Sequence, residues 1–81
     1  MTKKVIIPCD VNSRYAQHLI FNMVRIPEYC YIRKNERQVN AKSILGIFSL
    51  DLHKGDEVEF VVNCDRDIDA EAVFAPDDQK E

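Results

Sequence analysis

The sequence lacks several features that would assign it to a common functional class. No apolar run approaches the roughly 18 residues that a membrane-spanning helix needs. The apolar stretch near the N-terminus ends at Pro8, which is too short for a signal-peptide core. Positive charge is not in excess, since the net charge is −3 and the pI is near 5.3. A nucleic-acid binder needs a basic face. We therefore expect a cytoplasmic protein that contacts neither membrane nor nucleic acid.

Cysteine and histidine are also scarce, and their spacing suits neither a metal site nor a redox pair. Cys9, Cys30 and Cys64 are odd in number and far apart, and His18 and His53 do not stand at zinc-finger spacing from them. We expect three reduced thiols that act as small apolar residues, with a redox or metal role as the alternative. Glycine-rich phosphate loops and His-x-x-x-His pairs are missing too, so we expect neither a cofactor nor an enzyme.

What the chain does contain is typical of one small globular domain over residues 1–81. Of its residues, 46% are apolar and 31% are charged, which argues against disorder. Apolar periodicity and turn residues predict strands at 4–8, 29–34, 38–41 and 57–62, and helices at 13–24, 43–50 and 67–75. The order β-α-β-β-α-β-α predicts an α+β fold with the helices on one face of a mainly antiparallel four-stranded sheet. Residues 76–81 are expected to form a frayed tail.

Each predicted helix has an apolar side that should face the sheet. In the first helix the stripe consists of Ala16, Leu19, Ile20, Met23 and Val24. In the last helix the expected face consists of Ile68, Ala72 and Ala75. Between the second and third strands, Asn35-Glu36 resembles a tight turn. Because Glu36 would be strained in a left-handed conformation, that loop is expected to exceed two residues.

The first turn of the first helix contains polar residues that can carry chemistry. Arg14 lies near the helix N-terminus, where free N–H groups and the helix dipole favour an anion, although an ordinary exposed arginine is the favoured reading from the residues alone. His18 follows one turn later, opposite the apolar stripe. We expect it to be solvated, with a catalytic histidine as the alternative.

The segment after the third strand resembles a known family. Residues 40–50 read Asn-Ala-Lys-Ser-Ile-Leu-Gly-Ile-Phe-Ser-Leu and are followed by Asp-Leu-His-Lys-Gly-Asp-Glu-Val. This run of nearly twenty residues resembles the second-helix region of HPr, the small phosphocarrier of the bacterial sugar phosphotransferase system. The length and the element order also resemble that family. The resemblance implies an HPr-like open-faced β-sandwich with three helices on one side.

The resemblance also locates the phospho-accepting site, where this sequence departs from the pattern. Members carry histidine-x-arginine-proline-alanine at the start of the first helix, and counting back from Ser43 without gaps places that motif on residues 12–16. Arg14 and Ala16 match, whereas Asn12 stands at the histidine position and Tyr15 at the proline position. A carboxamide nitrogen is a very poor nucleophile because its lone pair is delocalised, so Asn12 should not carry phosphate. His18, the remaining candidate nucleophile, is no easy substitute, because it lies six residues later and away from the exposed N–H groups that would stabilise a phosphohistidine.

Ser43 matches the serine that HPr kinase/phosphorylase phosphorylates in Gram-positive members of the family. There, the phosphorylated protein binds the catabolite control protein, a transcriptional regulator. The sequence resembles Crh, a variant of HPr that lacks the histidine and keeps the serine. A phosphate at a helix N-terminus gains from the dipole and the free N–H groups. The alternative reading of Ser43 is a plain helix cap.

The second predicted helix is apolar nearly all round, which indicates an exposed binding surface. Ile47 and Leu50 are expected to pack on the sheet, which leaves Ile44, Leu45 and Phe48 partly exposed. The corresponding positions of HPr form its docking surface. Phe21 falls off the stripe of the first helix and extends this patch, unless it folds back over the core edge.

The leading hypothesis is therefore a non-catalytic regulatory protein of the phosphotransferase and catabolite control network, with Ser43 as its switch. Arg14, Phe21, Ile44, Leu45 and Phe48 would bind its protein partners. The alternatives are a phosphocarrier that uses another nucleophile and an unphosphorylated binding module. Because Pro76 stops the last helix early, the helix covers less of the sheet, and the exposed remainder is expected to favour self-association as a homodimer.

Overall fold

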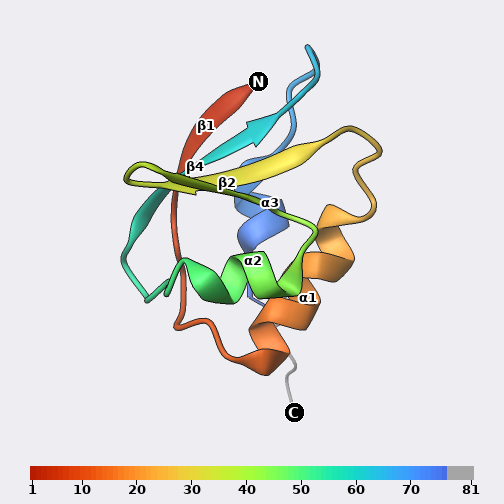
Figure 1. The fold of residues 1–81 in the computed structure, drawn as a ribbon. Coiled ribbons are helices and arrows are strands. Elements are labelled where there is room, and N and C mark those ends of the chain that lie inside the picture. The colour runs from red at the N-terminus through yellow and green to blue at the C-terminus, as the bar shows by residue number, and fades with distance from the viewer. Residues whose placement is uncertain (77–81) are drawn as a thin grey trace.

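The computed structural model describes residues 1–76 and shows one sheet covered on one face by helices (Figure 1). The elements are β1 (Thr2–Ile6), α1 (Ser13–Met23), β2 (Cys30–Lys34), β3 (Arg37–Asn40), α2 (Ile44–Ser49), β4 (Glu57–Val62) and α3 (Ala70–Phe74). The predicted element order and α+β class are confirmed. The frayed tail was predicted at 76–81, and its residues 77–81 lie outside the described part of the chain.

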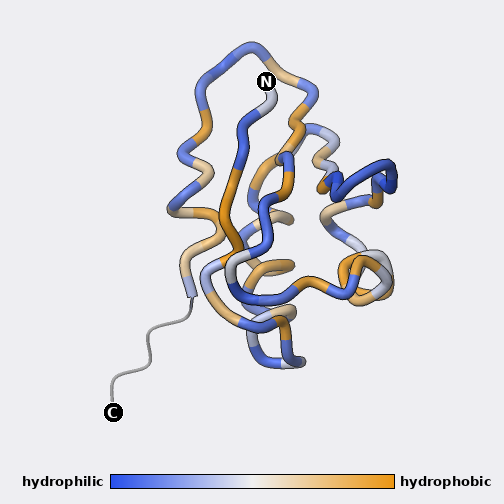
Figure 2. Tube along the Cα trace, turned by 90° about the vertical axis from the view of Figure 1, so that its left-hand side faces the viewer, coloured by the Kyte–Doolittle hydropathy of each residue, from blue (hydrophilic) through white to orange (hydrophobic). Residues whose placement is uncertain are grey.

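The sheet has the strand order β1-β4-β2-β3, and every neighbouring pair is antiparallel. The predicted strand at 57–62 has the same bounds in the structure, because its alternation is strict and Val58, Phe60 and Val62 all point into the core. β1 begins two residues earlier than predicted, since Thr2 and Lys3 already pair with β4. Buried and more exposed positions alternate along β4, as expected of a sheet with one solvated face, whereas Figure 2 shows β1 changing from hydrophilic to hydrophobic residues along its length.

The core lies between the sheet and the three helices. Ala16, Leu19 and Met23 of the predicted stripe are fully buried and Ile20 is partly buried. Val24 was wrongly placed on that stripe: it caps the C-terminus of α1 and is exposed. On α2, Ile47 and Leu50 are buried, which confirms the predicted packing face.

The last helix differs most from its prediction at 67–75. α3 begins at Ala70, because the Asp69 carboxylate caps it by accepting a hydrogen bond from Ala72 N at 3.3 Å. The predicted inner face was wrong for Ala72 and Ala75, which are exposed, whereas Ile68 packs partly buried against the core. Ala70 and Phe74 are the buried residues of α3.

The segment before α3 is irregular and is tied to the start of β1. The Lys3 ammonium donates to Ile68 O at 2.9 Å, and the chain's N-terminal amine donates to Cys64 O at 3.0 Å. These contacts hold the residues before Asp69 along the sheet, where a helix from residue 67 would have pulled away from it.

The hairpin between β2 and β3 is tighter than expected. Lys34 pairs directly with Arg37, so the loop consists of Asn35 and Glu36 alone. Asn35 has a positive φ of 58°, whereas Glu36 does not adopt a positive φ. The strain expected at Glu36 is avoided because asparagine, which tolerates the left-handed region, takes that position.

Candidate functional site

The start of α1 holds the position that the family resemblance assigns to the phosphohistidine. Asn12 is the N-cap, and its side-chain Oδ1 accepts a hydrogen bond from Tyr15 N at 2.8 Å. Its backbone carbonyl accepts from Ala16 N at 2.9 Å. The Asn12 side chain therefore has a structural role that explains why an asparagine stands there, independently of phosphate chemistry.

Tyr15, at the position that the resemblance gives to proline, anchors α1 to α3. Its side chain is buried, and its hydroxyl donates to Phe74 O at 2.7 Å. Burial, followed by the proximity of Cys9, raises the pKa of Tyr15. Sequence reasoning missed this residue, although the spacing from Tyr15 to Leu19 and Met23 would have placed it on the buried stripe.

The two candidate polar residues of α1 have different surroundings. Arg14 is exposed on the first turn, as expected. His18 is half-buried, where it was expected to be fully solvated. Its Nε2 lies 3.4 Å from Asn22 Nδ2, and Asn22 also donates to Val73 O on α3 at 3.0 Å. His18 thus belongs to the contact between α1 and α3.

Ser43 caps α2 in the same way that Asn12 caps α1. Its Oγ accepts a hydrogen bond from Gly46 N at 3.1 Å, and its own N–H donates to Asn40 O at 3.0 Å. The side chain is half-buried, and the cap uses the oxygen as an acceptor. The structure therefore shows that Ser43 caps α2, and phosphorylation of the same oxygen stays a prediction.

Ser43 is held in place by two neighbouring residues whose roles were not predicted from the sequence. A Cβ on Gly46 would lie 3.2 Å from Val39 Cβ and 3.4 Å from Asn40 O, so glycine lets α2 lie close against β3. The Lys42 ammonium donates to Ile26 O at 2.5 Å and to Glu28 O at 3.0 Å. Lys42 thereby ties the start of α2 to the chain just after α1, at the end of α1 that carries Phe21.

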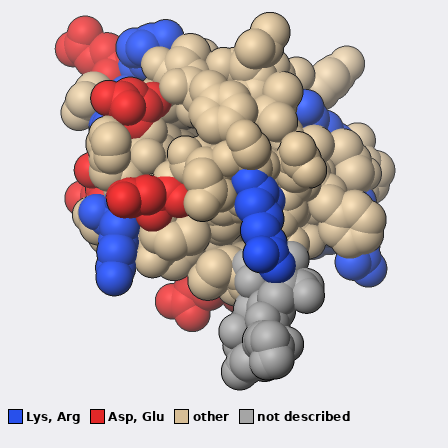
Figure 3. All heavy atoms as spheres, turned by 90° about the horizontal axis from the view of Figure 1, so that it is seen from below, with Lys and Arg blue, Asp and Glu red and all other residues tan. Residues whose placement is uncertain are grey.

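Exposed apolar side chains continue from α2 to α1, and we call this set, together with Arg14, the docking face. Leu45 is 79% exposed and Phe21 61%, while Phe48 and Ile44 are about two-fifths exposed. Phe21 does not fold back over the core; instead, the Arg25 guanidinium carbon lies 5.9 Å from its ring centroid. Figure 3, which views the molecule from below, shows a broad tan area without Lys, Arg, Asp or Glu. The predicted exposure is observed, whereas partner binding stays a prediction.

A hollow of about 210 Å³ lies beside Phe48 and was not foreseen from the sequence. Its walls come from the loop before α1 and the chain after α2, namely Asp10, Val11, Ile47, Phe48, Asp51, Leu52 and His53. Asp51 has a positive φ of 53°, and its carboxylate lies 3.2 Å from His53 Nε2. This backbone conformation is uncommon for a residue other than glycine, but it cannot be read from the sequence, so the hollow could not be predicted from it.

The cysteines do not pair with one another: Cys9 and Cys64 are half-buried and Cys30 is buried. Burial is the main cause of the raised pKa of Cys9 and of Cys30, which disfavours the reactive thiolate. Within residues 1–76 no cluster of three or more metal-ligating side chains occurs, and no helix there is long and apolar enough to cross a bilayer.

Together, the four-stranded sheet, the helices that cover it and the exposed apolar side chains of α1 and α2 define a small α+β protein. A family model described as "PTS HPr component phosphorylation site" matches residues 2–75. The chain therefore belongs to the HPr family, the phosphocarriers of the phosphotransferase system.

Solved structures agree with this assignment. The HPr-C-His protein of Thermoanaerobacter tengcongensis superposes with a TM-score of 0.78 at 24% identity, covering 91% of this chain and 85% of that one. The phosphocarrier protein HPr of Bacillus anthracis str. Ames gives 0.75 at 28% identity, covering 90% and 86%. An HPr dimer from T. tengcongensis gives 0.66 at 26% identity, covering 89% and 87%. No curated protein matches the sequence.

Proposed function

We propose that this member of the HPr family is a cytoplasmic regulatory protein that does not carry phosphate on histidine and that is switched by phosphorylation of Ser43. In this proposal it resembles Crh. Its partners would be an HPr kinase/phosphorylase and then a catabolite control protein or another phosphotransferase component. It would have no enzymatic activity and no cofactor of its own.

The observation that carries the proposal is the chemistry of the two helix caps. Asn12 offers a carboxamide whose oxygen already accepts the Tyr15 N–H, and its nitrogen is a poor nucleophile. Ser43 offers a hydroxyl, which can attack the γ-phosphorus of ATP. The Oγ–P bond forms as the bond to the ADP oxygen breaks, and the hydroxyl proton passes to a base of the kinase. Of the two caps, only Ser43 has a group suited to accept phosphate.

The surroundings of Ser43 fit a switch that changes partner binding. Ser43 begins the helix that carries Ile44, Leu45 and Phe48, so a phosphate there would place about two negative charges next to exposed apolar side chains. Arg14, exposed at the start of α1, adds a positive charge to the docking face. A partner that reads both a phosphate and an apolar patch would discriminate the modified from the unmodified protein.

The test is intact-mass spectrometry after two separate reactions. Incubation with HPr kinase/phosphorylase and ATP should add one acid-stable phosphate, and incubation with enzyme I and phosphoenolpyruvate should add none. Ser43→Ala should abolish the gain, whereas Ser49→Ala, which removes an exposed hydroxyl within α2, should keep it.

The outcomes separate the three readings. An acid-labile phosphate from enzyme I that disappears in His18→Gln would establish a carrier that uses His18 and would refute the proposal. No mass gain in either reaction would remove the Ser43 switch and leave an unphosphorylated binding module. With phosphorylated protein in hand, Leu45→Ala and Phe48→Ala should weaken capture of the catabolite control protein by about tenfold, as expected of apolar anchors.

A further inference from the structure

The edge strand β1 offers an unpaired row of backbone groups. β1 is the outermost strand beside β4. The backbone groups of Met1 and Ile7 point toward β4. Val62 N donates a hydrogen bond to Met1 O at 2.8 Å, and Ile7 N donates one to Asp56 O, just before β4, at 2.8 Å. Because bonding direction alternates along an antiparallel strand, the N–H and C=O groups of Thr2, Lys4 and Ile6 point to the free edge. No hydrogen bond from the described part of the chain reaches these groups.

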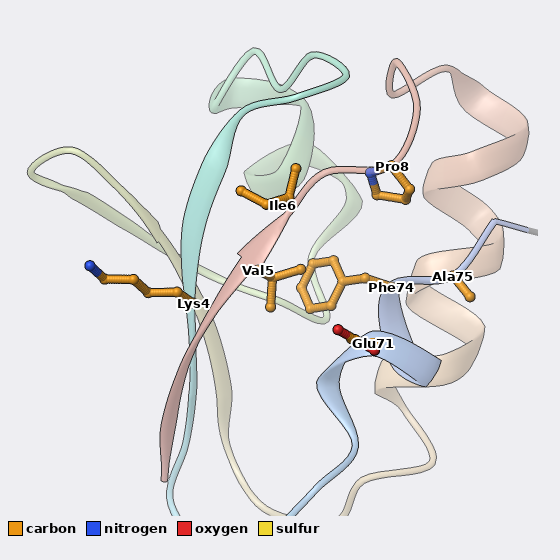
Figure 4. Close-up of a pocket in the computed structure, with 7 residues that line it drawn as sticks. All are labelled: Lys4, Val5, Ile6, Pro8, Glu71, Phe74 and Ala75. Carbon is orange, nitrogen blue, oxygen red and sulfur yellow. The ribbon is translucent and has the colours of Figure 1, made fainter.

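A hollow of about 320 Å³ runs along the same edge, between β1 and α3. Figure 4 shows the side chains of Val5 and Phe74 pointing toward one another there, with Glu71 at the rim, while Lys4 and Ile6 point away from α3. α3 ends at Phe74, and among residues 1–76 no further helix continues along the edge of β1 beyond it. Ile6 adds an apolar side chain, 58% exposed, on the opposite face of the strand.

We propose that β1 binds an extended segment of a partner protein as an added strand, and that this segment alternates apolar and acidic residues. A row of donors and acceptors at two-residue spacing is complementary to another extended backbone. Alternate side chains of the added strand would enter the hollow beside Val5 and Phe74, so these should be apolar. The others would lie beside Lys4, whose one ion pair within residues 1–76 is a long one of 3.9 Å to Glu57, so these should be acidic.

A second copy of this chain fits the same edge poorly. In a two-fold antiparallel pairing that engages all three outward-facing residues, Lys4 lies directly opposite its own copy, and like charges in that position destabilise a strand pair. A register that avoids this clash moves Thr2 opposite Pro8, which has no N–H to donate. Lysine on an edge strand is a common means of preventing self-association.

The probe is a capped heptapeptide, acetyl-Glu-Val-Glu-Val-Glu-Val-Glu-amide, titrated into the ¹⁵N-labelled full chain. We expect saturable shifts of the Thr2, Lys4 and Ile6 amides, together with at least tenfold slower hydrogen exchange there. The same peptide with lysine in place of glutamate should bind at least fivefold more weakly. Binding that shifts residues of the docking face but leaves β1 unchanged would overturn the proposal.

N-methylated peptides distinguish an added strand from a mere apolar contact. In an antiparallel pairing the residue opposite Lys4 has its side chain on the same face and its N–H toward β1. Methylating the glutamate amides should therefore abolish binding, and methylating the valine amides should leave it. Equal affinity of the two methylated peptides would overturn the proposal.

Variants of the protein provide the matched control. Lys4→Pro removes an N–H that bonds to nothing in β4 and should lose binding by at least tenfold, whereas Lys4→Ala keeps the N–H and should lose only two- to threefold. The methylated peptides test the proposal even if Lys4→Pro fails to fold. A chain ending at Pro76 should bind equally well; tighter binding would make its own C-terminal segment the occupant. The result is independent of the proposed Ser43 switch, since Ser43→Ala leaves β1 unchanged.

Discussion

The N-termini of α1 and α2 have the same cap but are held in place in opposite ways. In each helix the cap side chain accepts a hydrogen bond from the N–H three residues later, Tyr15 for Asn12 and Gly46 for Ser43. Tyr15 anchors α1 with a large buried side chain that reaches α3. Gly46 anchors α2 by having no side chain, which lets the helix approach β3.

This difference has a consequence for the two sites. The N-terminus of α1 is held by the hydrogen bond from Tyr15 to Phe74, and its cap, Asn12, has no group suited to accept phosphate. The α2 terminus is held by close packing and its cap is a hydroxyl. A modification of Ser43 would therefore act on a short helix of six residues whose position depends on a few close contacts with β3. We therefore expect substitutions at Tyr15 and at Gly46 to lower the free energy of unfolding for different reasons and by different amounts.

The largest expected effect is that of Gly46→Val. A Cβ at this position would lie 3.2 Å from Val39 Cβ, and the added methyl groups would force α2 away from β3. We expect the free energy of unfolding to fall by about 3 kcal/mol, as for other overpacked sites. Urea denaturation measures it, with Leu45→Val on the same helix as a control that should change stability by less than about 0.5 kcal/mol. A Gly46→Val protein as stable as the wild type would show that α2 is not held by close packing.

A smaller loss is expected for Tyr15→Phe. The substitution keeps the buried ring and removes the hydroxyl, so Phe74 O loses its hydrogen-bond donor. A buried carbonyl left without a partner costs about 1.5 kcal/mol. Tyr29→Phe, at an exposed tyrosine, is the control and should be within about 0.5 kcal/mol of the wild type. Equal effects of the two substitutions would mean that the link between α1 and α3 contributes nothing.

The stability of the wild type and that of Tyr15→Phe should respond differently to high pH. Burial raises the pKa of Tyr15 above the value of about 10 that it has in the unfolded chain. Above pH 10 the unfolded state therefore releases a proton that the folded state retains, so stability falls as pH rises. Between pH 10 and 11 the wild type should lose up to about 1.4 kcal/mol relative to Tyr15→Phe. Parallel pH profiles would contradict this assignment.

How far the sequence predicts this structure depends on whether a residue acts through its neighbours in the chain or through distant ones. The alternation of Val58, Phe60 and Val62 is a local signal, and the strand they form has the predicted bounds. The end of α1 near Val24 and the start of α3 were misjudged. At the start of α3 a deciding contact comes from far along the chain, from Lys3 to Ile68.

The same distinction applies to the candidate site. The exposure of Ile44, Leu45 and Phe48 followed from packing Ile47 and Leu50 on the sheet, which is a matter of helical periodicity. The role of Lys42 did not follow, because it depends on where the chain after α1 passes. Gly46 also needed the structure, since close approach to Val39 is invisible until β3 is in place.

The smallest expected effect is that of removing a helix cap. Substitutions at Ser43 also test whether this residue is only a cap or is a phosphorylation switch as well. Asn12→Ala and Ser43→Ala should each lower the free energy of unfolding by about 1 kcal/mol, because each removes the acceptor for one N–H at a helix start. Ser43→Asn should restore that stability, since asparagine caps as well as serine does. It should nevertheless gain no phosphate from HPr kinase/phosphorylase and ATP. If Ser43→Asn restores both stability and partner binding without phosphate, Ser43 is a cap alone, and the difference between the two helix termini is structural and not regulatory.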